Sequence, residues 1–407
     1  MDVIFNNIKA ISYDLIILGA GITGLSVARQ KVQTNPGCRI LIIEKEHKIG
    51  MHGSGRNSGV LHSGIYYPES TLKAKFCAEG SKLMSQYCED HNLPILRCGK
   101  IILPTNVADE SQIDLLHDRG LANGASVEII SQKEIREIEP EANTIVQKAL
   151  YSPNTSVVDP HKVLEKIQFE LINSGVTILF NEKLMSAIPD KSKIKTNKGH
   201  SFEYGHLINC TGQHSDVVSK IFGVGRKYTL LPFKGFYYGL HKDSNIRLNG
   251  LIYPVPDLNI PFLGVHSVKL VNGSVYFGPT AIPAFGREHY EGFEGINVKD
   301  ASSITYHLLR QYISNKKGFR AYTHQEASRF LKSEFLKSMQ NLIPNLSSND
   351  LVTSQKVGIR AQLLDKGRNE LVMDFLVEKM DNTTHVLNAV SPAFTSAFSF
   401  AKYILNK

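Results

Sequence analysis

The apolar residues of this chain occur in short runs that alternate with amphipathic stretches. Two runs of four apolar residues, at 15–18 and 40–43, are typical of buried parallel strands. The stretch between them, at 25–33, has the pattern of a helix. Residues 13–44 therefore predict a strand, a helix and a second strand, with a glycine-rich turn after the first strand.

The remainder of the chain alternates between the same two patterns. Amphipathic stretches predict helices at 72–91, 161–173, 304–313 and 326–342, and a mostly helical polar cover at 106–140. Apolar runs predict strands at 95–103, 176–180, 206–209 and 386–387, with a lysine-rich hairpin at 192–199. From about residue 226, short aromatic runs separated by Gly, Pro and Asn are typical of antiparallel strands with turns.

These elements predict an α/β protein with two domains. The length of 407 residues accommodates two domains at roughly 100–200 residues each. We expect residues 1–90, 145–225 and 350–407 to form a Rossmann-like dinucleotide-binding domain, because parallel-strand patterns resume after each interruption. Residues 91–144 and 226–349 are then expected to form an α+β substrate-binding domain built on an antiparallel sheet.

The turn after the first strand carries the GxGxxG fingerprint of dinucleotide-binding proteins. Gly19 allows the tight turn, Gly21 lets a pyrophosphate approach the backbone, and Gly24 lets helix and strand pack closely. The start of the helix presents free N–H groups to the phosphates. Glu44 ends the second strand, where its carboxylate can accept from a ribose hydroxyl. The neighbouring positions expected to contact the same ligand are Ile22, Thr23 and Lys45.

The loop at 45–71 is rich in Gly, Ser, His and Asn, a composition typical of functional loops. Arg56, Asn57 and Ser58 supply hydrogen-bond donors, and Gly59 lets the backbone approach a flat ligand. Two later segments are expected beside the same cofactor: the strand that runs into Thr211 and Gly212, and the start of the final helix near Ser391 or Pro392.

Composition and charge narrow the classes of partner. The net charge is +8, but the lysines are dispersed, which argues against a nucleic-acid partner and leaves an anionic substrate or an anionic membrane surface. The five cysteines form no CxxC pair, so neither a disulfide framework nor a metal site is expected. No apolar run reaches the ~18–20 residues that span a bilayer, and the first residues do not form a signal peptide. We expect a cytoplasmic protein, with peripheral contact to the inner membrane left open.

Several stretches resemble the FAD-dependent superfamily of D-amino-acid oxidase, and within it the L-2-hydroxyglutarate dehydrogenase/oxidase family. They are YDLIILGAGITGLSVAR, EKEHKIGMHGSGRNSGVLHSGIYYPESTLKAKFCAEG, CGKIILP, LIYPVPDLNIPFLGVHSVKLVNGSVYFGPTAI, GIRAQLLD and NAVSPAFTSA. The chain departs from the family pattern at Thr280, Phe394 and Ala397. The resemblance implies that FAD is the cofactor and that the final helix faces the flavin pyrimidine edge, through Ser391, Pro392, Thr395 and Ser396.

The resemblance also implies a reaction: oxidation of L-2-hydroxyglutarate to 2-oxoglutarate by hydride transfer from C2 to flavin N5. The electrons would pass to oxygen, a quinone or an electron-transfer flavoprotein. The alternatives are glycerol 3-phosphate, another 2-hydroxy acid or a small amino acid or amine as substrate, or a non-catalytic flavoprotein.

The reaction requires a base, fixed cations for carboxylates, and hydrogen-bond donors for the substrate. We expect His62 or His266 as the base, Lys234 and Arg360 as carboxylate anchors, and Tyr66 and Tyr253 as donors. The FAD is expected to be non-covalent, and His52 is the residue to examine for a covalent link.

Overall fold

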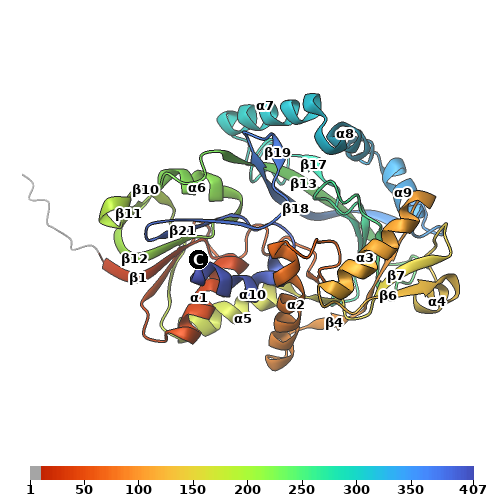
Figure 1. The fold of residues 1–407 in the computed structure, drawn as a ribbon, viewed down its shortest axis with the longest axis horizontal. Coiled ribbons are helices and arrows are strands. Elements are labelled where there is room, and N and C mark those ends of the chain that lie inside the picture. The colour runs from red at the N-terminus through yellow and green to blue at the C-terminus, as the bar shows by residue number, and fades with distance from the viewer. Residues whose placement is uncertain (1–10) are drawn as a thin grey trace, which may run out of the picture.

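The computed structural model describes residues 11–407, and an eight-stranded sheet forms its centre (Figure 1). The strand β1 lies between β2 and β12 and pairs with both in parallel, and β21 extends the sheet in parallel beyond β12. The expectation about a signal peptide concerns mainly residues 1–10, which lie outside the described residues. The strands of this sheet are β1 (Ile11–Leu18), β2 (Ile40–Ile43), β9 (Thr177–Leu179), β10 (Leu184–Ile188), β11 (Lys193–Thr196), β12 (Ser201–Asn209), β20 (Leu376–Met380) and β21 (Thr383–Asn388).

Helices cover both faces of this sheet, because its central strands are apolar on both sides. Leu15 and Ile17 of β1 pack into one core cluster and Ile16 and Leu18 into another, as expected from the alternation of side chains along a strand. The first cluster contains the helices α1 (Ile22–Thr34), α2 (Leu72–Asp90), α5 (Pro160–Asn173) and α10 (Ala393–Asn406), and α6 (Ser215–Ile221) lies beside the second. The predicted helices at 72–91 and 161–173 are confirmed.

A six-stranded antiparallel sheet forms the second large layer, and α7 (Val298–Ser314) and α8 (Phe319–Ser328) lie over it (Figure 1). Its strands are β13 (Tyr228–Leu240), β15 (His266–Lys269), β16 (Val275–Gly278), β17 (Ile282–Pro283), β18 (Leu351–Asp365) and β19 (Glu370–Leu371). Two smaller sheets contain β14 (Leu251–Pro254), β5 (Lys100–Leu103), β7 (Lys148–Ser152) and β6 (Glu128–Ser131), and β3 (Val60–Leu61), β8 (Ser156–Val158) and β4 (Ile95–Arg97). The predicted α/β class with antiparallel sheets is confirmed.

Five predicted elements were wrong in extent. The expected strand 95–103 is two strands in different sheets, because Gly99 adopts a φ of +67° between them. The expected cover 106–140 contains the strand β6 between α3 (Glu110–Ala122) and α4 (Gln132–Ile138). The expected helix 326–342 is two helices, α8 (Phe319–Ser328) and α9 (Lys332–Gln340), because Leu331 is extended. The helix expected at 304–313 extends further at both ends as α7 (Val298–Ser314), and α1 begins three residues earlier than the expected 25–33.

The division into two domains stays a prediction. The strand β18, which the division assigns to the dinucleotide-binding domain, pairs with β13 from Leu351 to Asp365 in the antiparallel sheet. We therefore propose that residues 351–371 belong with the antiparallel sheet. Within residues 11–407, no helix combines the length and the apolar character that a membrane span requires.

Candidate active site

A pocket of about 450 Å³ lies between the parallel sheet and the antiparallel sheet. It is bounded by the end of β1, the loop at 50–58, the end of β12, the strands β13 and β18, and the start of α10. The structure thus brings together segments that are far apart in the sequence. The predicted site residues that line the pocket are Gly19, Gly21, Ile22, Thr23, Glu44, Lys45, Arg56, Asn57, Ser58, His62, Thr211, Gly212, Tyr253, His266, Arg360, Ser391, Pro392 and Thr395.

The fingerprint glycines allow close approaches of the backbone. A Cβ on Gly24 would lie 2.0 Å from the carbonyl oxygen of Gly19, so only glycine permits this contact between helix and turn. Gly19 has a φ of +101°, and a Cβ there would lie 2.6 Å from the oxygen of Cys210. Gly24 itself does not line the pocket, which agrees with a packing role for this residue.

The carboxylate of Glu44 is held at the end of β2 by backbone donors. The N–H groups of Ala20 and Glu46 donate to its two oxygens, at 2.8 and 3.0 Å. This fixes a negative group beside the glycine turn, and each oxygen keeps a lone pair for a further donor.

These features fit the dinucleotide cofactor that the fingerprint implies. The N-cap residues Gly21 of α1 and Pro392 of α10 make no side-chain hydrogen bond to their helices, although the N–H of Ile22 in α1 donates to Ser54 Oγ at 2.9 Å. Both helices therefore direct N–H groups and positive dipole ends to the pocket that their first residues line. Gly19, Gly21 and Glu44 would hold the pyrophosphate and ribose, and the start of α10 would lie at the flavin.

The loop residues predicted as donors to the flavin mainly build the loop. The guanidinium group of Arg56 donates to Met51 O at 3.0 Å and Val357 O at 3.3 Å. The side chain of Asn57 donates to Ser54 O and accepts from the N–H of Gly59. These bonds shape the backbone that faces the pocket, so the side chains of Arg56 and Asn57 position the loop.

Two further predicted cofactor residues, Thr395 and Gly59, have structural contacts. The hydroxyl of Thr395 donates to Val60 O and accepts from the N–H of His62, which ties α10 to β3. Gly59 has a φ of +76° and packs against Val158 O, where a Cβ would be 2.2 Å away. Gly59 and Ser396 do not line the pocket.

Two buried histidines stand at the catalytic end of the pocket. Nδ1 of His266 lies 2.8 Å from Gly264 O, and because a carbonyl oxygen only accepts, Nδ1 carries the hydrogen and Nε2 the lone pair. Burial lowers the pKa of His266 to about 4. Burial, and then the charge of Lys100, hold the pKa of His62 well below 6.5. Both imidazoles are therefore neutral at pH 7 and able to accept a proton.

Two cations flank these histidines. Arg360 lines the pocket, with its guanidinium group 5.4 Å from the ring of Phe262 and no hydrogen-bond partner for Nε among the described residues. Lys100 is 1% exposed, and its Nζ has no partner among the described residues. Lys100 does not itself line the pocket; its Nζ lies 5.4 Å from the ring of Tyr253, which does, and burial lowers the pKa of Lys100 to about 8.

No sequence motif indicated Lys100 as a site residue. One feature of the sequence does indicate it. Lys100 is the first residue of β5, whose residues are all buried and otherwise apolar. A charged residue inside such a strand requires a partner.

The structure does not bring Lys234 to the pocket. Its neighbours Phe233 and Gly235 line the pocket, and because side chains alternate along β13, Lys234 is directed to the other face. Tyr66 also does not line the pocket; it is buried, with its ring 4.9 Å from Nζ of Lys100. Tyr253 does line it, and its ring stacks on His266 with centroids 3.8 Å apart.

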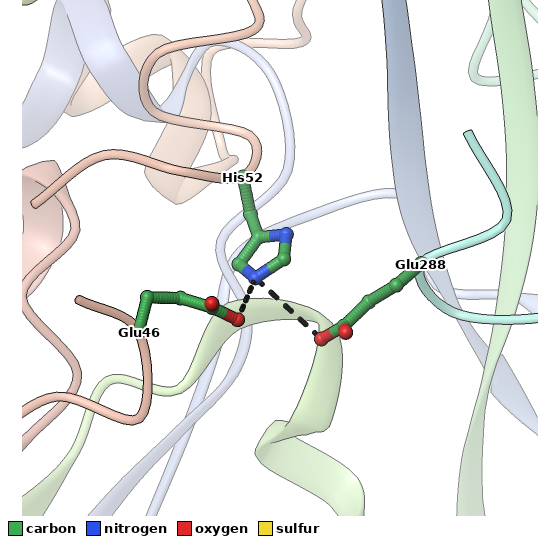
Figure 2. A group of neighbouring side chains, drawn as sticks. All are labelled: Glu46, His52 and Glu288. Atoms are coloured by element: carbon green, nitrogen blue, oxygen red, sulfur yellow. Dashed lines mark hydrogen bonds and ion pairs between the residues drawn. The ribbon is translucent and has the colours of Figure 1, made fainter. Parts of the chain in front are cut away.

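Glu46, His52 and Glu288 converge at the rim of the pocket (Figure 2). Nε2 of His52 lies 2.8 Å from Glu46 and 3.5 Å from Glu288. The ammonium group of Lys45 forms ion pairs with both carboxylates, at the place that a bound cation would take. Burial alone would lower the pKa of Lys45, but its hydrogen bonds to Glu288 and Glu46 raise it. This cluster is therefore built as an ion-pair network.

The same network occupies both ring nitrogens of His52. Nδ1 lies 2.9 Å from the hydroxyl of Tyr290, and Nε2 faces Glu46 and Lys45. These contacts leave no free nitrogen for a covalent bond to a flavin, which favours the expected non-covalent FAD.

Comparisons with known proteins agree with this geometry. A family model described as FAD dependent oxidoreductase matches residues 14–406. A mitochondrial L-2-hydroxyglutarate dehydrogenase from Nematostella vectensis is 34% identical, covering 97% of this chain and 90% of its own. The L-2-hydroxyglutarate dehydrogenase of Escherichia coli K12 is 32% identical, covering 97% and 93%.

Solved structures share the fold at low sequence identity. The dithionite-reduced L-alpha-glycerophosphate oxidase from Mycoplasma pneumoniae, with FAD bound, has a TM-score of 0.74 at 20% identity, covering 97% of this chain and 94% of its own. The glycine oxidase from Geobacillus kaustophilus has a TM-score of 0.72 at 14% identity, covering 98% and 94%. The chain therefore belongs to the FAD-dependent oxidoreductases and, among them, to the family of the L-2-hydroxyglutarate dehydrogenases.

Proposed function

We propose that this enzyme oxidises L-2-hydroxyglutarate to 2-oxoglutarate. The names of its relatives support this substrate. The observation that carries the proposal is the pair of cations at the catalytic end, Lys100 and Arg360, which have no carboxylate partner among residues 11–407. A cation that loses water in a protein interior requires an anion, and a dicarboxylate offers one to each of them.

In the proposed reaction, the guanidinium group of Arg360 binds one substrate carboxylate, and Lys100 attracts the other. His62 or His266 accepts the proton of the C2 hydroxyl, and C2 becomes a carbonyl carbon. FAD, when bound, supplies the acceptor for the two electrons and the hydrogen of C2. The bound dianion offsets the charges of Lys100 and Arg360, so the pKa of the neighbouring His62 rises and the imidazole becomes a stronger base.

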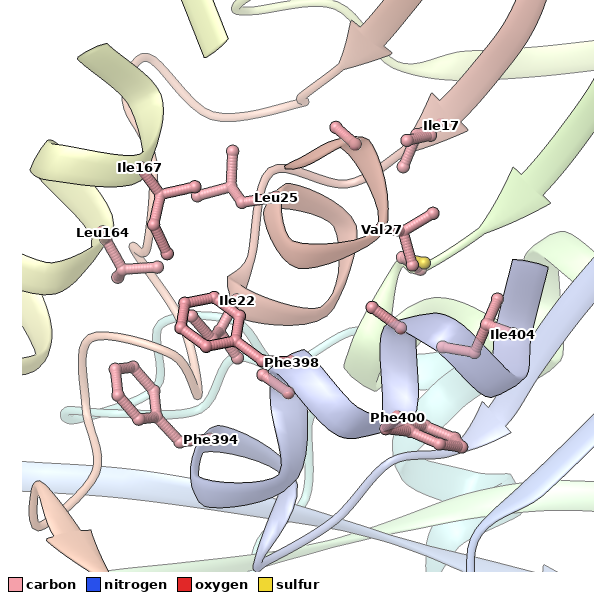
Figure 3. Packing of buried hydrophobic residues seen from close by; sticks show 14 of the residues in the cluster. Ile17, Ile22, Leu25, Val27, Leu164, Ile167, Phe394, Phe398, Phe400 and Ile404 are labelled. Atoms are coloured by element: carbon pink, nitrogen blue, oxygen red, sulfur yellow. The ribbon is translucent and has the colours of Figure 1, made fainter. Parts of the chain in front are cut away.

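The route of the electrons and the location of the enzyme belong to the same proposal. We propose oxygen or a membrane quinone as the acceptor, for a cytoplasmic enzyme in peripheral contact with the inner membrane. The aromatic C-terminal helix is not the site of that contact. Phe394, Phe398 and Phe400 of α10 are buried, and they pack beside α1 and α5 in the core (Figure 3).

The test is anaerobic titration of the purified, FAD-loaded protein, followed at the flavin absorption band. We expect L-2-hydroxyglutarate to bleach this band, and the D-isomer and glycerol 3-phosphate to leave it unchanged. Bleaching by glycerol 3-phosphate or by an amine, and not by the dicarboxylate, would retain the fold and overturn the substrate. A yellow protein that no hydroxy acid or amine bleaches would overturn catalysis itself.

A further inference from the structure

The helix α7 presents an apolar face to solvent. Val298 is 85% exposed and Ile313 is 73% exposed, and Tyr306 and Leu309 are also exposed. These four positions, with exposed Ser302 between them, follow spacings of three and four residues, which places them in one stripe along the helix.

The opposite face of α7, which packs against the protein, is partly polar. Its buried residues are Ile304, His307 and Gln311. The amide of Gln311 donates to the backbone and side-chain oxygens of Asn369, and Arg310 donates to Lys366 O. Specific hydrogen bonds therefore fix the orientation of the helix, so the apolar stripe is held outward.

The charges around the stripe differ between its two ends. Lys299, Lys316, Lys317 and Arg320 are exposed at the two ends of the helix. Between residues 298 and 332, the acids are Asp300, which lies 3.7 Å from Arg287, and Glu326, which is buried in an ion pair with Arg329. Exposed Glu291 and Glu294 precede the helix, so the charge at its start is mixed, and Glu370 pairs with Lys316 at 3.2 Å. At the other end of the stripe, Lys317 and Arg320 are exposed and have no acidic partner among the described residues, so the charge there is positive.

We propose that this surface, formed by the outer face of α7 and residues 315–320, docks onto an anionic lipid bilayer. An apolar stripe with flanking lysines and arginines is the arrangement of helices that lie in a membrane interface, where the apolar side chains enter the acyl boundary and the cations meet the headgroups. A dimer formed through this surface would instead place the same lysines of two copies opposite one another, where their charges would repel. This inference deepens the proposed peripheral contact and does not depend on the identity of the substrate.

Vesicle flotation of the FAD-loaded protein tests the surface. We expect binding to vesicles of phosphatidylcholine with phosphatidylglycerol, little binding to phosphatidylcholine alone, and a decrease when salt is added, because salt screens surface charge. A double variant, Leu309→Ser with Ile313→Ser, is expected to reduce binding by more than about tenfold. A charge variant, Lys299→Glu with Lys317→Glu, is expected to abolish the preference for anionic lipid.

The control carries Met185→Ser with Ile188→Ser, which removes two exposed apolar side chains from β10. We expect it to bind like the wild type, and all variants to keep the wild-type flavin content and far-ultraviolet circular dichroism. Equal loss of binding in the control, or no binding by the wild type, would overturn the proposal. A concentration-dependent dimer in sedimentation velocity that Ile313→Ser dissociates would assign the stripe to self-association instead. The flavin titration above is independent of each of these outcomes.

Discussion

Lys100 loses its hydration inside the protein and gains only aromatic rings in return. Its Nζ lies 4.9 Å from the ring of Tyr66 and 5.4 Å from that of Tyr253. Cation–π attraction offsets only part of the desolvation cost, which explains why burial lowers the pKa of Lys100 to about 8. A residue that destabilises the fold in this way is a candidate for a binding role.

The substitution Lys100→Met should separate the effect of Lys100 on substrate binding from its effect on the stability of the fold. We expect the KM for L-2-hydroxyglutarate to rise about 10-fold, since the attraction between Lys100 and a carboxylate that it does not touch contributes about 1–2 kcal/mol. The melting temperature should stay equal or rise, because methionine removes a buried charge and retains the volume. Steady-state kinetics and thermal unfolding measure the two effects.

The matched control is Lys269→Met, since Lys269, unlike Lys100, already has a hydrogen-bond acceptor, Leu248 O, at 2.8 Å. The wild type should also lose substrate affinity as the pH rises through about 8, where Lys100 loses its charge, and Lys100→Met should not. An unchanged KM in Lys100→Met would assign the lysine a structural role only.

At the scale of elements, the connection between β1 and α1 decides whether the cofactor site forms. The tight turn depends on the close contact of Gly24 with the carbonyl oxygen of Gly19. A side chain at position 24 would prevent this contact. The patterns that predicted this unit are local, since a buried run, three spaced glycines and an amphipathic helix all lie within residues 13–44. The strands and the helix of this unit were therefore predicted correctly in type and order, and the roles of its residues in cofactor binding stay a prediction.

The substitution Gly24→Ala should prevent cofactor binding. Its Cβ would be 2.0 Å from Gly19 O, so α1 must move away from β1, at an expected cost of about 3 kcal/mol or more. Absorption spectra of the purified protein report flavin content, and urea unfolding reports stability. Gly37→Ala is the control, because a Cβ at Gly37 meets nothing within 4 Å. Equal flavin content in both variants would refute the packing role.

Other elements depend on pairing partners that local patterns do not reveal. The apolar run 95–103 reads as one strand, yet its halves pair with β8 and with β7 and β14. Along β13, aromatic residues occupy both faces, so the direction of Lys234 could not be inferred from alternation. The register that places Arg360 opposite Phe233 is a property of the assembled sheet. Of the six residues predicted for the catalytic end, the pocket is lined by His62, Tyr253, His266 and Arg360 and not by Lys234 and Tyr66, and Lys100 was not predicted.

At the scale of the whole molecule, several buried histidines affect the response to acid. Burial lowers the pKa of His266 and His385 to about 4 and also holds that of His62 well below 6.5. In the unfolded chain these groups bind protons as the pH falls through about 6.5. Between about pH 6.5 and 4 the unfolded state therefore binds more protons, and stability decreases as the pH falls.

Urea unfolding at about pH 7.5 and pH 5 tests this linkage. We expect a lower free energy of unfolding at pH 5, and a smaller difference in His385→Gln, which removes one such group that does not itself line the pocket. His117→Gln, at a histidine on α3 that is not buried, should behave like the wild type. Identical stability at the two pH values would contradict the buried, neutral state of these histidines.

The pocket is built from both halves of the polypeptide, since Gly19 and Thr395 line the same space and α1 packs against α10. Ribosomes release a protein from its N-terminus onward, so the glycine turn emerges hundreds of residues before the segment that closes the cavity. Cofactor capture must therefore await the translation of α10. Until then, the emerging β1–α1–β2 unit exposes apolar surface that α10 later covers, and this interval is when the nascent enzyme depends most on chaperones.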